Sequence, residues 1–131
     1  MKVFLSYSHA DQAFAHELRN SIEKLGVTVE DPDNAFGSGT AWAESIRGGL
    51  EQADVILLIV PEAGAKGANN AFFEAGAGHA LGKLVLGVVP EPRNTRLREL
   101  PADLLGFAVM DASNKPLDAI AKTLVHAMEP A

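Results

Sequence analysis

The stretch from Val55 to Val60 is an unbroken run of aliphatic residues, and it constrains the fold more than any other segment. Such a run is typical of a central parallel strand that is covered on both faces, because both sets of alternating side chains must then be apolar. Parallel strands are joined by crossover helices, so strands and helices should alternate along the chain. The run is far too short to cross a bilayer.

The rest of the sequence supplies this alternation. Four other apolar runs predict further strands: Val3–Leu5, Val27–Val29, Leu84–Val89 and Phe107–Met110. Apolar residues at helical spacing lie between them. One helical stripe ends at Gly26 and consists of Phe14, Leu18, Ile22 and Leu25. A second is marked by Trp42, Ile46 and Leu50, a third spans residues 68–81, and the last has the inner face Leu117, Ile120, Leu124 and Met128. We therefore predict one α/β domain over residues 1–131, a flavodoxin-like three-layer sandwich with a five-stranded parallel sheet.

Composition excludes several classes of function. The chain has a formal net charge of −6, which argues against nucleic-acid binding. It contains no cysteine, so disulfides and thiolate chemistry are excluded, and its four histidines have no metal-ligand spacing. We expect no metal and no membrane segment. Because the N-terminal residues do not form a signal peptide, we expect a cytoplasmic protein.

In a doubly wound sheet, ligands bind beyond the carboxyl ends of the strands. Ser6-Tyr7-Ser8, the loop 31–41 and residues 61–70 are all predicted to lie at that edge. Glu74 is expected to open the helix that follows, and the glycines and alanines after it would leave room for a ligand. A lone carboxylate at such a surface suits the stabilisation of a sugar ring that becomes positively charged.

Several segments, taken in order, resemble the Toll/interleukin-1 receptor (TIR) domain family. Val3 to Asp11 looks like the opening strand and loop of that family, and Gly39-Thr40-Ala41-Trp42 resembles its Gly-x-x-Trp segment. Ala53 to Val60 resembles the next strand. Many TIR domains are NAD glycohydrolases or cyclases whose essential glutamate lies early in the helix after the third strand, and by position that glutamate is Glu74.

The resemblance implies NAD+ as the substrate, no separate cofactor, and cleavage of the nicotinamide–ribose bond. The family often has a tryptophan four residues before the glutamate, where this chain has Asn70; the accompanying aromatic is either absent or replaced by Phe72, Phe73 or Tyr7. The resemblance also implies self-association through the loop 31–41, a separate sensor or effector protein, and a role in antiphage defence or immune signalling. The candidate substrate-binding residues are Ser6, Tyr7, Ser8, Phe36, Trp42, Asn70 and Phe73.

Two other functions stay open. The segment Glu74 to Lys83 resembles nucleoside 2-deoxyribosyltransferases, in which the glutamate attacks the sugar. A non-enzymatic adaptor that binds other TIR domains would share the fold without needing the carboxylate. Individual residues also have structural interpretations: a first-turn acid for Glu74, a core anchor for Trp42, helix caps for Ser6 or Ser8, and a packed ring for Tyr7.

Overall fold

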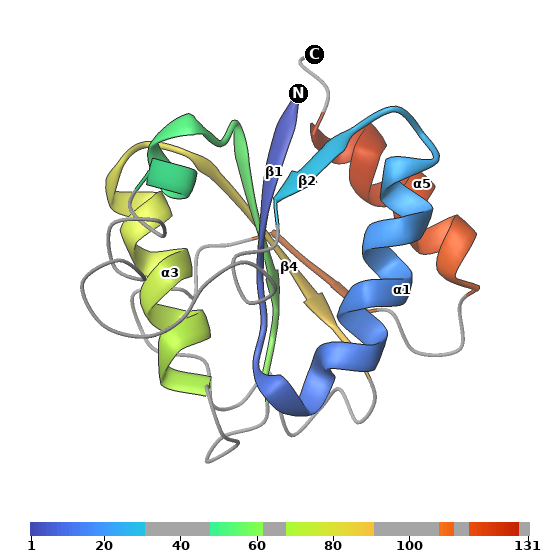
Figure 1. Cartoon of the computed structure of the whole chain (residues 1–131), viewed down its shortest axis with the longest axis horizontal. Helices are drawn as coiled ribbons and strands as arrows, with labels where there is room; N and C mark the ends of the chain where they lie inside the picture. Colours follow the sequence, from blue (N-terminus) through green and yellow to red (C-terminus); the bar gives the residue numbers. More distant parts are fainter. Residues whose placement is uncertain (31–47, 62–67, 91–107, 112–115, 129–131) are drawn as a thin grey trace.

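Five parallel strands form one sheet through the centre of the molecule (Figure 1). The computed structural model describes residues 1–30, 48–61, 68–90, 108–111 and 116–128. The strands are β1 (Lys2–Ser6), β2 (Thr28–Glu30), β3 (Val55–Ile59), β4 (Leu84–Val89) and β5 (Ala108–Asp111). Their order in the sheet is β2-β1-β3-β4-β5, which is the flavodoxin-like order and confirms the predicted fold class.

The register of the central strands brings their carboxyl ends to one edge of the sheet. Ser6 of β1 lies opposite Leu58 of β3, and Ile59 at the end of β3 lies opposite Val88 of β4. All five residues of β3 are buried, as expected for a strand covered on both faces. Helices that begin at this edge therefore bring their first turns beside the ends of β1 and β3.

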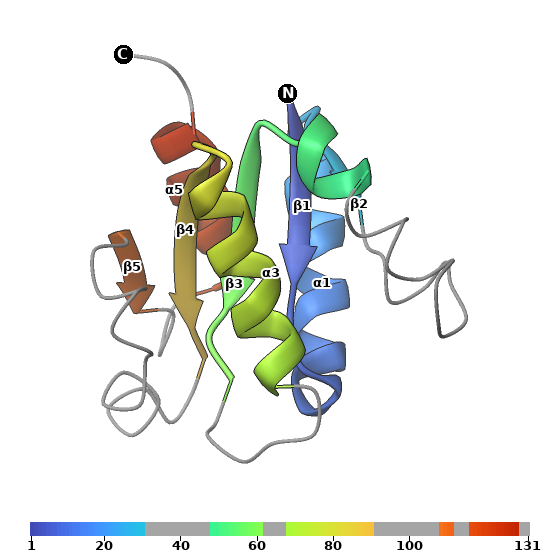
Figure 2. The ribbon, with the colours of Figure 1, turned by 90° about the vertical axis from the view of Figure 1, so that its left-hand side faces the viewer.

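Helices cover both faces of the sheet. α1 (Gln12–Glu23) and α5 (Leu117–Met128) lie on one face, and α3 (Ala68–Ala80) lies on the other, as the two ribbon views show (Figure 1, Figure 2). A short 3-10 turn, η1 (His9–Asp11), leads from β1 into α1, and residues 48–52 are helical. The three layers confirm the predicted sandwich.

Side chains of β1 alternate between the two cores. Val3, Leu5 and Tyr7 belong to the apolar cluster under α1 and α5, whereas Phe4 belongs to the cluster under α3. This alternation follows from the two-residue period of a strand. The residue after Leu5, Ser6, therefore points toward α3.

The helical stripes were predicted correctly in most positions. Ile120, Leu124 and Met128 of α5 are buried as expected. α1 ends at Glu23, and Gly26 follows with a positive φ of 88°, which is the usual conformation of a glycine that stops a helix. Leu25 was wrongly assigned to the buried stripe: it lies beyond the last residue of α1 and its side chain is exposed.

The small residues of α3 allow the helix to lie very close to the sheet. Ala71, Ala75 and Gly78 are buried at spacings of four and three, so they form the helix face that packs on the strands. A Cβ atom added to Gly78 would stand 2.4 Å from Cγ1 of Ile56 in β3. Ala71, Ala75 and Gly78 therefore serve close packing, so the room expected for a ligand does not lie on this face of the helix. Gly76 points into open space instead.

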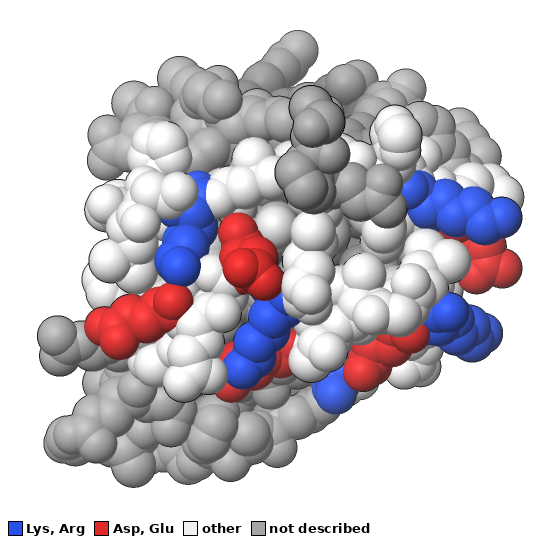
Figure 3. Space-filling view, turned by 90° about the horizontal axis from the view of Figure 1, so that it is seen from above, with Lys and Arg blue, Asp and Glu red and all other residues white. Residues whose placement is uncertain are grey.

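The amino edge of the sheet carries charges of both signs, interspersed over the surface (Figure 3). There the backbone N–H of Lys2 donates to Asp54 Oδ2 at 2.8 Å, and its Nζ donates to Gln52 Oε1 at 3.1 Å. Lys2 Nζ also lies 3.3 Å from Glu30 Oε2. These contacts tie β1 to β2 and to the turn before β3. Within the described ranges, no helix has the length and apolar character needed to cross a membrane.

Candidate active site

Glu74 lies on the face of α3 that packs against the sheet. Its side chain is only 4% exposed, between the buried residues Ala71, Ala75 and Gly78. α3 begins at Ala68, so Glu74 is in the second turn and no acidic residue occupies the first turn. The interpretation of Glu74 as a first-turn acid that complements the helix dipole is therefore wrong, as is the expectation that it opens the helix.

Ser6 is the residue of the sheet that meets Glu74. Its hydroxyl donates to Glu74 Oε1 at 2.7 Å, and its Oγ also lies 3.0 Å from the backbone oxygen of Ala71, one turn earlier in α3. Ser6 is 1% exposed. The contact forms because Ser6 ends β1 on the α3 side of the sheet. Ser6 caps no helix, so the capping interpretation does not apply to it.

Tyr7 points toward the opposite face of the sheet from Ser6. Its ring packs in the core under α1 and α5, with the edge of the His16 ring 6.1 Å away between centroids at 83°. The Tyr7 hydroxyl lies 3.4 Å from His16 Nε2. The packed-ring interpretation of Tyr7 agrees with this placement. Strand alternation therefore separates the Ser6-Tyr7-Ser8 set, which the sequence had grouped.

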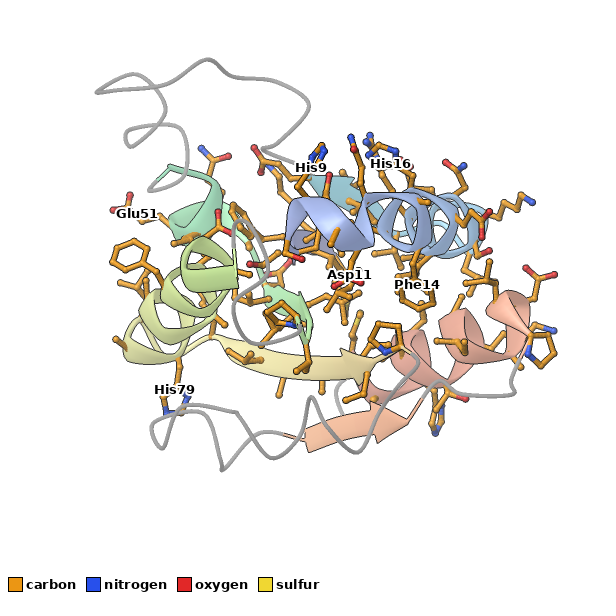
Figure 4. All side chains as sticks on the ribbon, turned by 90° about the horizontal axis from the view of Figure 1, so that it is seen from below. His9, Asp11, Phe14, His16, Glu51 and His79 are labelled. Atoms are coloured by element: carbon orange, nitrogen blue, oxygen red, sulfur yellow. The ribbon has the colours of Figure 1, made fainter. Side chains whose placement is uncertain are left out.

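Ser8 and Asp11 form a second buried polar pair at the carboxyl edge. Ser8 Oγ lies 3.4 Å from Asp11 Oδ2, and the backbone N–H of Asp11 donates to the Ser8 oxygen at 3.0 Å. Seen from that edge, Asp11 points inward while His9 lies on the outer side (Figure 4). Ser8 precedes η1 but makes no side-chain cap bond to it. The sequence reasoning missed Asp11; the signal available was a carboxylate three residues after a serine at a strand end.

The other predicted site residues lie either on α3 or outside the described residues. Phe73 is 66% exposed on α3, so its ring lies on the outer surface of the helix. Asn70 lies in the first turn of α3, the turn that begins at the carboxyl edge. Phe36 and Trp42 lie outside the described residues. In the part of the chain that the structure describes, no three His, Asp or Glu residues are grouped so that they could hold a metal ion.

The arrangement joins a buried carboxylate to the end of the first strand of a doubly wound sheet. Ligands of this architecture bind beyond the carboxyl ends of the strands. A carboxylate that accepts a short hydrogen bond from a fixed hydroxyl is held in one orientation and can be kept charged in an apolar setting. Such a group can stabilise a positive charge, accept a proton, or attack an electrophilic carbon.

The fold and this edge define a doubly wound α/β domain. The chain belongs to the TIR domain family, because the family model described as "TIR domain" matches residues 3–125. No curated protein matches the chain significantly.

Two solved structures resemble the chain over nearly its whole length. The TIR domain of the Toll-related receptor TRR-2 from Hydra magnipapillata has a TM-score of 0.66 and 16% identity, with 96% of each chain covered. The CMP N-glycosidase BcmB from Clostridium botulinum has a TM-score of 0.63 and 20% identity, with 97% of this chain and 99% of that chain covered. At these identities the likeness establishes the shared fold.

Proposed function

We propose that this TIR domain is an enzyme that cleaves the N-glycosidic bond of a nucleotide, with NAD+ as the substrate and Glu74 as the catalytic residue. The observation that carries the proposal is the place of Glu74: it is buried on the core-facing side of α3 and joined to Ser6 at the carboxyl edge of the sheet. Membership of the TIR family supports the substrate.

Glu74 interrupts an otherwise apolar face of α3. Its helical neighbours on the same face are Ala71, Ala75 and Gly78, and the facing strand residues are apolar apart from Ser6. Removing a carboxylate from water is costly, and well-packed apolar residues in place of a buried polar group are often neutral or stabilising. A residue that breaks the apolar pattern at the ligand edge of a sheet is therefore a strong candidate for function.

Cleavage of the nicotinamide–ribose bond can be catalysed by a single carboxylate. As the nicotinamide–ribose bond breaks, the bonding electron pair goes to the nicotinamide nitrogen and the sugar becomes an oxocarbenium-like cation. Nicotinamide leaves as a neutral base, so the leaving group needs no proton. Glu74 would stabilise the cation, orient a ribose hydroxyl, or form a transient bond to the sugar. Water or an adenine nitrogen would then complete hydrolysis or cyclisation.

Family membership also supports a biological setting. We propose that copies of this domain associate, that association raises the activity, and that a separate sensor or effector protein provides or receives the signal. NAD+ depletion or a cyclic ADP-ribose-type product would then act in antiphage defence or immune signalling in the cytoplasm. The candidate assembly loop, residues 31–41, lies outside the described residues.

A second candidate function is N-glycosidic cleavage or exchange on a pyrimidine nucleotide or a deoxynucleoside. It is favoured by the full-length structural likeness to a CMP N-glycosidase and by the resemblance of residues 74–83 to nucleoside 2-deoxyribosyltransferases. Cytosine is a poorer leaving group than nicotinamide and needs protonation as it departs. This candidate therefore requires a proton donor beside Glu74, which the NAD+ reaction does not.

The test is product analysis by mass spectrometry with NAD+, CMP and deoxynucleosides offered separately to the wild type and to Glu74→Gln. The proposal expects nicotinamide release by the wild type and a loss of about 10²–10³-fold in the variant. Cleavage of CMP or a deoxynucleoside, with NAD+ untouched, would favour the second candidate. Cleavage of none of them by a concentrated, folded protein would favour an adaptor that binds other TIR domains.

The matched control is Ser21→Ala, which alters a buried side chain of α1 on the opposite face of the sheet. This variant should retain wild-type turnover of whichever substrate is cleaved. Glu74→Gln keeps the length of the side chain and an oxygen that can accept from Ser6, and its melting temperature, recorded beside the wild type, shows whether the variant folds. If Glu74→Gln folds but loses activity, the loss would then be caused by removal of the carboxylate.

A further inference from the structure

We infer that Ser6 is a positioning residue for Glu74 rather than a substrate-binding residue. This inference rests on the proposed function, since it assigns Ser6 a role in the reaction of Glu74. Ser6 had been expected to contact the nucleotide because it ends the first strand at the ligand edge. Its side chain is instead 1% exposed, and both oxygen atoms near its hydroxyl belong to α3.

The hydroxyl of Ser6 is an anchored donor that fixes the orientation of the Glu74 carboxylate. Ser6 is the last residue of β1 and pairs with Leu58 of β3, so the hydroxyl is carried by the hydrogen-bonded sheet. It reaches Glu74 Oε1 at 2.7 Å, within the usual range of a short bond from a hydroxyl to a carboxylate. Glu74 has several rotatable side-chain bonds, and this contact selects one orientation among them.

The backbone oxygen of Ala71 is a second acceptor for the Ser6 hydroxyl, beside Glu74 Oε1. A hydroxyl has one proton to donate and can accept in return. While Glu74 is charged, Ser6 donates to Oε1; when the cation forms beside Glu74 and draws on its charge, the proton can turn toward the Ala71 oxygen at 3.0 Å. The buried hydroxyl of Ser6 therefore has an acceptor in either case, and no polar group is left unsatisfied if its bond to Glu74 weakens.

A positioning role and a binding role predict different kinetics. If Ser6 orients Glu74, Ser6→Ala lowers kcat by about 10- to 100-fold and leaves KM within about twofold of wild type. If Ser6 binds the substrate, the same variant raises KM. Ser6→Thr keeps the donor and should restore most of kcat, and Ser6→Cys, with its weaker donor, should fall between Thr and Ala.

Two further measurements show whether Ser6 acts through Glu74. In the Glu74→Gln background, adding Ser6→Ala should change the residual rate by less than about twofold, because the group being positioned is already lost. The carboxyl carbon resonance of Glu74, assigned by its absence in Glu74→Gln, should move in Ser6→Ala and stay in place in Ser21→Ala. The resonance needs no substrate and reports the contact directly.

These outcomes separate the two proposals. If the wild type cleaves no nucleotide but the Glu74 resonance moves in Ser6→Ala, the proposed function fails while the positioning contact stands. If NAD+ is cleaved and Ser6→Ala has wild-type kcat, or if Ser6→Ala and Ser6→Thr are equally impaired, the inference about Ser6 is overturned. A rise in KM alone would return Ser6 to the substrate-binding set.

Discussion

Gly76 and Gly78 lie two residues apart in α3, yet an alanine at each should have opposite effects on stability. At Gly76 an added Cβ meets nothing within 4 Å. Alanine is better than glycine in a helix by about 1 kcal/mol, chiefly because it lowers the entropy of the unfolded chain. Gly76→Ala should therefore raise the free energy of unfolding by about 0.5–1 kcal/mol.

At Gly78 the added Cβ would stand 2.4 Å from Cγ1 of Ile56 and 3.1 Å from its Cδ1. Ordinary contact between carbon atoms is about 3.5–4 Å, so α3 or Ile56 must move by about 1 Å. Ile56 is fully buried in the central strand β3. Overpacking of this kind costs about 1–3 kcal/mol. After the gain in helix propensity, we expect a net loss of about 1–2 kcal/mol.

The displacement should also reach the proposed active site. Gly78 is one turn after Glu74 on the same helix face, and the Glu74–Ser6 bond is 2.7 Å long. If α3 retreats by about 1 Å, this bond passes the limit of a useful hydrogen bond. Misplacement of a catalytic group by that amount can cost about 10²-fold in rate. Gly78→Ala should therefore lose both stability and turnover.

Urea denaturation followed by circular dichroism, run beside nucleotide cleavage, checks the pair. Gly76→Ala should unfold at a higher urea concentration than the wild type with unchanged turnover, and Gly78→Ala at a lower one with reduced turnover. The account of α3 packing would be refuted by a Gly78→Ala protein as stable as Gly76→Ala.

Four other predictions concern the rest of the chain. Specific activity should fall when the protein is diluted, if association completes the site; a specific activity that is constant over a wide dilution series would oppose the proposed self-association. Ile120→Ala should destabilise the fold by about 2–5 kcal/mol in denaturant titrations, because the side chain is 1% exposed in the α1–α5 core. Gly26→Ala should also destabilise, by about 1 kcal/mol, since alanine strains at a φ of 88°; equal midpoints would contradict this. Arg19→Ala breaks a solvent-exposed pair with Glu23 at 3.0 Å, and because exposed ion pairs contribute little, its free energy of unfolding in urea should fall by less than about 1 kcal/mol; a larger loss would contradict this.

The fold could be predicted from the sequence because the sequence signals that define it are local. The unbroken run at residues 55–60 identified the central strand, and Gly26 marked the end of α1. The error at Leu25 arose from extending a helical period past the last residue that the glycine allows. Periodicity alone does not reveal where a helix ends to within one or two residues.

The site was readable only in part. Glu74 was identified as the candidate, and the predicted helix over 68–81 agrees with α3 (Ala68–Ala80); the expectation that Glu74 opens the helix conflicted with that start, which puts Glu74 in the second turn, where it lies on the buried face. The spacing of Ala71, Ala75 and Gly78 contained that information, since these residues share a helix face with Glu74. The partnership with Ser6 was hidden because it joins residues 68 positions apart, and only the close approach of α3 to β1 creates it. Strand alternation, a local rule, would have separated Ser6 from Tyr7.

We propose that this TIR domain cleaves NAD+ with the buried carboxylate of Glu74 at the ligand edge of the sheet. The most direct measurement is nicotinamide release from NAD+, quantified by mass spectrometry at high protein concentration, for the wild type and Glu74→Gln with their melting temperatures recorded in parallel. We expect release by the wild type and a loss of about 10²–10³-fold in a variant that still folds cooperatively. Equal release by the folded variant, or none by the wild type at any concentration, would contradict it.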